Sequence, residues 1–175
     1  PVKRDEWRGG PPVVNASYSG TRNEMWFPAG ILQAPFFDKD YPMAMNFGAI
    51  GVVMGHELTH GFDDQGRKYD ANGMLQPWWE ESVIGEFEKR TACVDELYSS
   101  QEVEPGLKVN GKLTLGENTA DMGGVKQAYG AYQTWKKENG GDATPHVEGL
   151  TNDQLFFVSF AQIWCTKATP EYLRV

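Results

Sequence analysis

The sequence has few cysteines and few histidines, which limits how it can be cross-linked or bind metal. Its 175 residues include two cysteines, Cys93 and Cys165, and three histidines. Two cysteines are too few for a disulfide scaffold, and these two are too far apart for a zinc knuckle. A metal site with nitrogen ligands must therefore draw on a very small set of side chains.

Basic clusters and long apolar runs are also missing. The net charge is −8 and no lysine–arginine cluster occurs, which argues against nucleic acid and against an anionic membrane surface as partners. No apolar run approaches the roughly 18 to 20 residues that a membrane-spanning helix needs. We therefore expect no nucleic-acid binding, and contact with a membrane only through an anchor elsewhere in a parent protein.

The chain does contain enough apolar material for a folded core. Hydrophobic residues make up 40% and aromatic residues 13% of the sequence, and the length favours a single domain. The sequence starts at Pro1 without an initiating methionine and stops within a pattern at Val175. We therefore expect residues 1–175 to be part of a domain of a longer protein.

The apolar pattern predicts an α+β fold that is mainly α-helical. Strands are expected at 13–18 and 24–27, where the intervening turn composition favours a hairpin. A nearly all-apolar stretch predicts a buried central helix at 43–62, whose glycines favour close approach of a neighbouring backbone. Further helices are expected from Pro77 to about Ser99 and over 114–138. A buried helix is expected over 155–165, after a capping box at Thr151–Gln154. Loops are expected at 102–112 and 141–149.

The central helix carries the motif Gly55-His56-Glu57-Leu58-Thr59-His60-Gly61. In a helix, His56 and His60 lie one turn apart on the same face. Two imidazoles with this spacing can bind one zinc ion, and Glu57 beside them is a candidate general base. A buried Glu57 without a partner would be costly, so the motif predicts one Zn2+ per chain.

A third zinc ligand is expected, because catalytic zinc usually has three protein ligands and a water. The remaining histidine, His146, lies in a segment typical of an exposed loop. Glu117 and Asp121 open the helix expected at 114–138 and share one of its faces. We expect one of these carboxylates to bind the metal while the other hydrogen-bonds a ligand histidine.

These residues predict hydrolysis of a peptide bond. Zinc polarises a carbonyl and lowers the pKa of its bound water towards roughly 7. Glu57 can take the proton of that water as it attacks, and then pass the proton to the leaving amine. Asp63, or Asp64 beside it, follows His60 within a turn and is a candidate to orient its ring. Developing oxyanion charge also needs donors, and no convincing His or Arg candidate for that role is evident in the chain.

Several stretches of the sequence match motifs of a known family. They are Val14–Tyr18, Phe27–Gln33, Gly55–Asp64, Leu115–Asp121, Gln154–Phe157 and Ala161–Cys165. Through them the chain resembles the neprilysin family (M13-type) of zinc metallopeptidases, which includes endothelin-converting enzymes and bacterial secreted relatives. The resemblance covers nearly the whole chain.

The resemblance implies a fold and a set of catalytic roles. The fold would be part of a thermolysin-like zinc peptidase catalytic domain with a central zinc-binding helix. His56, His60 and Glu117 would bind zinc, Glu57 would be the base, and Asp121 would orient His56. An extracellular, periplasmic or cell-surface setting is also implied.

Substrate binding follows from the same resemblance. Asn15 and Ala16 would lie on an edge strand and bind the backbone of an extended peptide, which an amide can do as both donor and acceptor. A hydrophobic pocket would favour cleavage of small peptides on the amino side of a large apolar residue. Its residues would be Ile31, Phe36, Val52, Val53, Ile163 and Trp164.

The sequence also departs from the family. Family members carry, beyond the point equivalent to Val175, a His and an Arg that stabilise the transition state and hold substrate. They also carry an N-terminal large helical domain that restricts access, and it too is missing here. We therefore expect residues 1–175 to be a partial catalytic domain, with the rest of the parent chain as a partner, that binds zinc but is weakly active or inactive alone. In relatives with equivalent cysteines each pairs elsewhere, so Cys93 and Cys165 are expected not to be bonded to each other.

Two other hypotheses are weighed against this one. The first is a thermolysin-like protease with a different remainder, against which the Asn15-Ala16 strand and the stretch Phe27–Leu32 argue. The second is a non-catalytic, zinc-holding peptide-binding module, against which the intact Glu57 argues for the parent protein.

Overall fold

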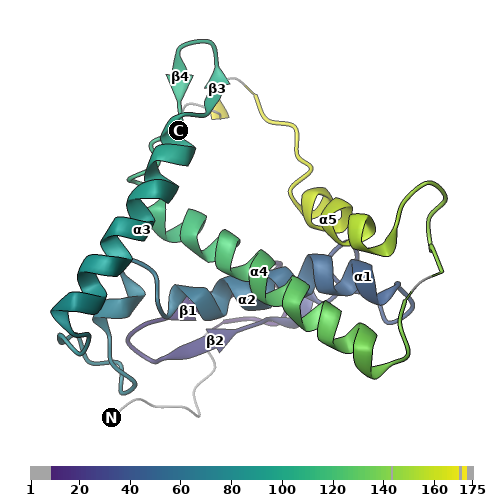
Figure 1. Cartoon of the computed structure of the whole chain (residues 1–175), viewed down its shortest axis with the longest axis horizontal. Helices are drawn as coiled ribbons and strands as arrows, with labels where there is room; N and C mark the ends of the chain where they lie inside the picture. Colours follow the sequence, from purple (N-terminus) through teal and green to yellow (C-terminus); the bar gives the residue numbers. More distant parts are fainter. Residues whose placement is uncertain (1–8, 143, 170, 173–175) are drawn as a thin grey trace.

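A computed structural model of the chain describes residues 9–142, 144–169 and 171–172. The described part is mainly helical, as predicted, with two small two-stranded sheets (Figure 1). Helix α4 (Leu115–Glu138) crosses a central helical segment, α3 (Glu81–Ser99) packs against α4, and α5 (Asn152–Ile163) packs against the start of the central segment. This arrangement places the first turn of α4 beside the histidine motif.

The central segment is continuous and confirms the helix predicted at 43–62. It consists of α1 (Met43–Asn46), a π-helical turn η2 (Phe47–Gly51) and α2 (Val52–His60). The segment ends at Gly61, whose N–H bonds to the last carbonyls of the helix. The π turn was not predicted, because it leaves the apolar composition of the segment unchanged.

Glycines lie where α2 crosses α4, and they allow the two backbones to approach closely. A methyl group added at Gly124 would lie 2.6 Å from the Val52 carbonyl oxygen and 2.8 Å from the His56 amide nitrogen. One added at Gly55 would lie 2.9 Å from the Cα atom of Gly124. The close approach predicted for the glycines of the central helix is therefore present, and it fixes the spacing of the two helices.

A core of apolar side chains holds α4 and α5 on the central segment. Tyr132 and Phe156 are fully buried, and their rings stack with centroids 6.0 Å apart. Gly48 leaves room for the Phe156 backbone. The predicted capping box starts α5: the Thr151 hydroxyl accepts the Gln154 N–H, and the Gln154 side chain accepts the Thr151 N–H.

The predicted N-terminal hairpin is present but shorter than expected. Antiparallel strands β1 (Ser17–Ser19) and β2 (Glu24–Trp26) replace the strands expected at 13–18 and 24–27. Pairing ends two residues before Pro28, which has no N–H to donate to a ladder and leads into the 3-10 turn η1 (Ala29–Ile31). Residues 13–16, which were expected in the first strand, are therefore left without a strand partner.

A second hairpin lies where a loop was predicted at 102–112. Strands β3 (Glu102–Glu104) and β4 (Leu107–Lys108) pair antiparallel across Gly106, whose φ is +80°. The segment is short and mostly polar, so it lacks the apolar alternation that identifies strands.

Two helix predictions need correction. Helix α3 begins at Glu81 and not at Pro77; Trp79 stays outside the helix and packs its ring 5.5 Å from that of Phe87. Helix α5 runs from Asn152 to Ile163 and not over 155–165. It is also not buried all round, because Phe157 and Val158 are each 45% exposed.

Two further findings concern the cysteines and the membrane. The thiols of Cys93 and Cys165 are both free and exposed. Among the described residues, no helix combines the length and the apolar character that crossing a bilayer requires.

Candidate metal centre and active site

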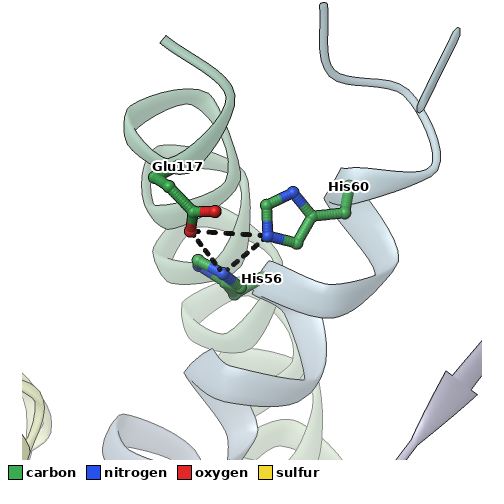
Figure 2. Close-up of side chains that lie close together, drawn as sticks. All are labelled: His56, His60 and Glu117. Carbon is green, nitrogen blue, oxygen red and sulfur yellow. Dashed lines mark hydrogen bonds and ion pairs between the residues drawn. The ribbon is translucent and has the colours of Figure 1, made fainter. Parts of the chain in front are cut away.

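The two histidines of α2 and a glutamate of α4 point at one spot. The Nε2 atoms of His56 and His60 are 2.9 Å apart, and the rings meet edge-on. Glu117, in the first turn of α4, brings its Oε2 atom 3.3 Å from His56 Nε2 and 3.5 Å from His60 Nε2 (Figure 2). Three potential ligand atoms from two helices thus form a small triangle.

The dimensions of this triangle fit a tetrahedral zinc ion. Two ligand atoms that each lie about 2.0–2.1 Å from zinc at a tetrahedral angle are about 3.3 Å from one another. The three sides here are 2.9, 3.3 and 3.5 Å. An ion bound by these three atoms would keep its fourth position for water or substrate, as catalytic zinc sites do.

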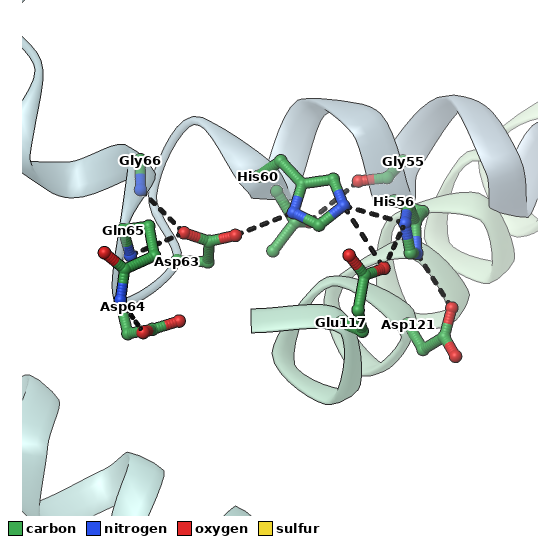
Figure 3. A network of polar contacts seen from close by, with 10 residues as sticks. Gly55, His56, His60, Asp63, Asp64, Gln65, Gly66, Glu117 and Asp121 are labelled. Atoms are coloured by element: carbon green, nitrogen blue, oxygen red, sulfur yellow. Dashed lines mark hydrogen bonds and ion pairs between the residues drawn. The ribbon is translucent and has the colours of Figure 1, made fainter. Parts of the chain in front are cut away.

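A carboxylate holds each histidine ring from behind (Figure 3). Asp121 Oδ1 lies 2.8 Å from His56 Nδ1, and Asp63 Oδ2 lies 2.6 Å from His60 Nδ1. Because a carboxylate accepts, each Nδ1 carries the proton and each Nε2 presents a lone pair to the triangle. Two lone pairs and a carboxylate oxygen this close together repel unless a cation lies among them, so the donor set fits a resident metal ion.

The loop after α2 holds Asp63 in place. Its second oxygen accepts the N–H groups of Gln65 and Gly66 at 2.8 and 2.7 Å. Burial raises the pKa of Asp63, but the hydrogen bonds from His60 and from these amides outweigh it and bring the pKa below its ordinary value. Asp64, the alternative partner for His60, accepts instead from the Gln65 side chain.

Glu57 lies next to the triangle and is almost fully buried. Its residue is 5% exposed, and its Oε2 atom has no hydrogen-bond partner among the described residues. Burial raises the pKa of this carboxyl, and the nearby His56 and His60 offset only part of the rise. A carboxylate made more basic in this way is suited to accept a proton.

These groups line an open cleft of about 630 Å³. The cleft includes Asn15 and Ala16, which precede β1, and it brings together every site residue predicted from the sequence. Ile31 and Val52 are only 3% and 1% exposed, so they also belong to the core. The apolar part of the wall contains the six residues predicted for a hydrophobic pocket: Ile31, Phe36, Val52, Val53, Ile163 and Trp164.

The sequence did not identify Tyr18 as a cleft residue. Its hydroxyl donates to Asn23 Oδ1 at 2.9 Å, and burial together with Asp63 raises its pKa. The backbone N–H of Tyr18 faces Glu57 and lowers the pKa of that carboxyl. The available signal was spacing, because Tyr18 lies two residues after Ala16 and such residues share a face of an extended chain.

His146 lies away from this site, as its loop context predicted. It belongs to the connection between α4 and α5, its side chain is 41% exposed, and its Nε2 atom lies 3.0 Å from Asp142 Oδ1. Among the described His, Cys, Asp and Glu side chains, the cluster able to hold a metal consists of His56, His60 and Glu117.

Comparison with known proteins finds similar sequences and similar structures. The profile of Peptidase family M13 matches residues 15–175. Endothelin-converting enzyme 1 of Bos taurus is 60% identical over 168 residues, which cover 96% of this chain and 22% of that protein. Neprilysin-1 of Caenorhabditis elegans is 52% identical over 174 residues, which cover 98% of this chain and 23% of that protein.

Two solved structures extend the comparison to the fold. A Mycobacterium tuberculosis zinc metalloprotease in complex with an inhibitor is 46% identical with a TM-score of 0.87, covering 96% of this chain and 26% of that one. A Haemonchus galactose-containing glycoprotein complex is 36% identical with a TM-score of 0.88, covering 98% of this chain and 28% of that one. The chain thus spans between 22% and 28% of the length of these four proteins.

Proposed function

Because the chain belongs to peptidase family M13, we propose that the full-length protein is a zinc-dependent endopeptidase and that the metal centre is its catalytic centre. One observation carries the proposal. Three ligand atoms 2.9 to 3.5 Å apart lie in an open cleft beside buried Glu57, whose Oε2 atom has no hydrogen-bond partner among the described residues.

The residues of this chain divide the work of hydrolysis. His56, His60 and Glu117 would hold a zinc ion, which would supply Lewis-acid polarisation of the scissile carbonyl and make water more acidic. Glu57 accepts a proton from the attacking water and then donates it to the leaving amine. Asp121 keeps the His56 ring in the tautomer that offers Nε2 to the metal. Asp63 does the same for the His60 ring.

The cleft supports a peptide substrate with a large apolar side chain. Asn15 and Ala16 line the cleft just before the start of β1. An extended peptide could bind beside them through backbone hydrogen bonds. The apolar part of the cleft wall, which includes Ile31 and Trp164, would receive the side chain that follows the scissile bond. We therefore infer cleavage of small peptides on the amino side of a large hydrophobic residue.

Residues 1–175 alone are proposed to bind zinc but to be weakly active or inactive. An oxyanion needs donors besides the metal, and each donor lost typically costs about a hundredfold or more in kcat. Among the described residues that line the cleft there is no arginine, and the histidines are both proposed zinc ligands. The missing oxyanion donors would come from the rest of the full-length chain. We propose an extracellular, periplasmic or cell-surface location for that protein.

The test compares the full-length protein with residues 1–175, each with and without Glu57→Gln. For the full-length protein, Glu57→Gln should lower kcat by about a hundredfold or more and leave the zinc content at one ion per chain. Glu148→Gln, at an exposed glutamate of the α4–α5 loop, is the matched control and should change neither. An active Glu57→Gln protein would refute the role of Glu57.

The same comparison addresses the alternative of a zinc-holding, non-catalytic module. Zinc binding without hydrolysis by the full-length protein would favour that module over the peptidase. Full activity of residues 1–175 would refute the proposal that the described cleft lacks oxyanion donors.

A further inference from the structure

The cleft carries a sequence pattern whose chemistry the proposed peptidase function leaves unexplained. Asn15-Ala16-Ser17 follows the Asn-x-Ser pattern that is N-glycosylated in secreted proteins. None of the other asparagines in the sequence is followed by Ser or Thr two residues later. The single acceptor pattern of the chain therefore lies on the proposed substrate-binding segment.

The structure leaves the acceptor atom accessible. Asn15 is exposed and precedes β1, outside the strand ladder that begins with the pair Ser17–Trp26. Its Oδ1 atom accepts the Ala16 N–H at 2.9 Å, while its Nδ2 atom has no hydrogen-bond partner among the described residues. A sugar on Nδ2 would thus break no strand pair.

The neighbouring residues keep their structural contacts when Asn15 is modified. Ala16 is 7% exposed and packs with Ile31 and Ile50, and Ser17 is held by β2. These contacts do not involve the Asn15 side chain, so the glycosylated chain is expected to reach the same fold. The glycan would then stand at the cleft, which Asn15 lines together with Glu57 and the zinc-binding triangle.

We propose that Asn15 is N-glycosylated when the protein passes through a eukaryotic secretory pathway, and that the glycan closes the cleft to peptides. The second part rests on the proposed peptidase function. Two relatives, of 60% and 52% identity, are animal proteins. Glycosylation thus divides the secreted protein into open and closed molecules.

The chemistry is a transfer from a lipid-linked oligosaccharide. The Nδ2 atom of Asn15 forms a bond to C1 of the first N-acetylglucosamine, and the bond between that carbon and the lipid diphosphate breaks. The amide loses one proton and the lipid diphosphate leaves with the electron pair. The amide that would donate to a substrate backbone keeps a single N–H and carries a bulky sugar.

The test uses the full-length protein with three residues at position 17: wild type, Ser17→Thr, which keeps the acceptor pattern, and Ser17→Ala, which removes it. Each is made in a secretory eukaryotic host and in bacterial cytoplasm, where no glycan is added. Peptide mass spectrometry gives the occupancy of Asn15. The bacterial preparations carry no glycan and therefore give the effect of each substitution alone. The activity of each secreted protein is divided by the activity of the same variant made in bacteria.

We expect wild type and Ser17→Thr from the secretory host to carry the glycan, and Ser17→Ala to lack it. After division by the bacterial values, secreted Ser17→Ala should be at least ten times as active as glycosylated wild type. Should Ser17→Ala fold poorly, fractions of secreted wild type whose Asn15 occupancy differs by mass spectrometry provide the same comparison without a substitution.

An unmodified Asn15 in secreted wild type would overturn the proposal. So would a glycosylated fraction whose activity is within twofold of the unglycosylated fraction. If the unglycosylated full-length protein hydrolyses no peptide at all, the proposed peptidase function fails, and the closing of a working cleft fails with it. The mass spectrum separates that failure from an absence of glycan.

Discussion

At the scale of single residues, the site depends on which nitrogen of each imidazole carries the proton. Asp121 and Asp63 accept from the Nδ1 atoms of His56 and His60 at 2.8 and 2.6 Å. Each carboxylate fixes a tautomer and makes the opposite nitrogen a better ligand. Metal affinity should therefore respond to residues that do not touch the metal.

The first prediction concerns Asp121→Asn. An amide oxygen still accepts from His56 but lacks the negative charge, so zinc affinity should fall about 10- to 100-fold. Competition with a chromophoric chelator measures the affinity. Asp40→Asn, which removes an equal charge from a side chain that is 77% exposed and pairs with Lys39, should leave it unchanged. An Asp121→Asn protein with wild-type affinity would contradict the prediction.

The sequence identified these residues better than it assigned their contacts. The spacing of His56 and His60 is a property of one helix, so periodicity alone predicted that they share a face. Whether Glu117 or Asp121 faces the histidine Nε2 atoms depends on how α4 crosses α2, which is a non-local property. The choice between Asp63 and Asp64 depended on a loop conformation that no periodicity describes.

At the scale of elements, the spacing of α2 and α4 sets the geometry of the triangle. The second prediction is that Gly124→Ala disrupts both packing and metal binding. Its new methyl group would lie 2.6 Å from the Val52 carbonyl oxygen, so the helices must separate. We expect a loss of roughly 1–3 kcal/mol in the free energy of unfolding and weaker zinc binding.

Gly130→Ala provides a control on the same helix. A methyl group there meets nothing within 4 Å, so this substitution should stabilise the protein by roughly 0.5–1 kcal/mol. Urea unfolding and chelator competition measure both variants. The prediction is wrong if Gly124→Ala and Gly130→Ala behave alike.

The third prediction concerns the ion pair that joins α4 to the first turn of α5. Lys136 Nζ lies 2.9 Å from Asp153 Oδ1, and the hydrogen bond from Lys136 is the main reason why the pKa of Asp153 lies below its ordinary value of 3.8. A lowered folded-state pKa stabilises the fold above the unfolded pKa, and this contribution is lost as the pH falls through the folded pKa.

At neutral pH, wild type should therefore be more stable than Asp153→Asn by roughly 0.5–1 kcal/mol, a small value because the aspartate side chain is 42% exposed. The difference should shrink as the pH falls below about 4. Urea unfolding at several pH values, with a chelator present to keep metal out, measures it. A difference that grows towards acid pH would contradict the assignment.

Element boundaries were predicted where local chemistry marks them. The capping box at Thr151 and Gln154 located the start of α5, because both of its hydrogen bonds are local. The β3–β4 hairpin was missed because it is stabilised by strand pairing rather than by an apolar pattern. The start of α3 was misplaced because Trp79 packs on Phe87 instead of joining the helix, and that contact is tertiary.

At the scale of the whole molecule, the metal should stabilise the fold. The fourth prediction is that zinc raises the melting temperature of the full-length protein, with a gain of about 2.7 kcal/mol at a free concentration 100 times the Kd. Glu117→Gln removes one ligand and should reduce this gain strongly. Calorimetry with zinc and with chelator measures it, and an equal gain in the variant would argue against Glu117 as a ligand.

The mainly helical class of the molecule was predictable because apolar periodicity is recorded along the chain. The cleft was not predictable from periodicity, since it forms between β1, α2, α4 and the end of α5. Its proposed substrate-binding residues were predicted only through resemblance to a family, which carries information about three-dimensional contacts that a single pattern lacks.

The positions of the ligands along the chain have a topological consequence. His60 is the last residue of α2 and Glu117 lies in the first turn of α4, so a bound ion would tie together the two ends of a segment that contains α3 and the β3–β4 hairpin. Closing a loop of roughly 60 residues with a cross-link removes conformational entropy worth about 4 kcal/mol from the unfolded chain. Doubling such a loop changes that cost by only about 0.6 kcal/mol. A bound metal would thus cross-link the two ends of this segment, which could gain or lose residues between α3 and α4 at little cost to the site.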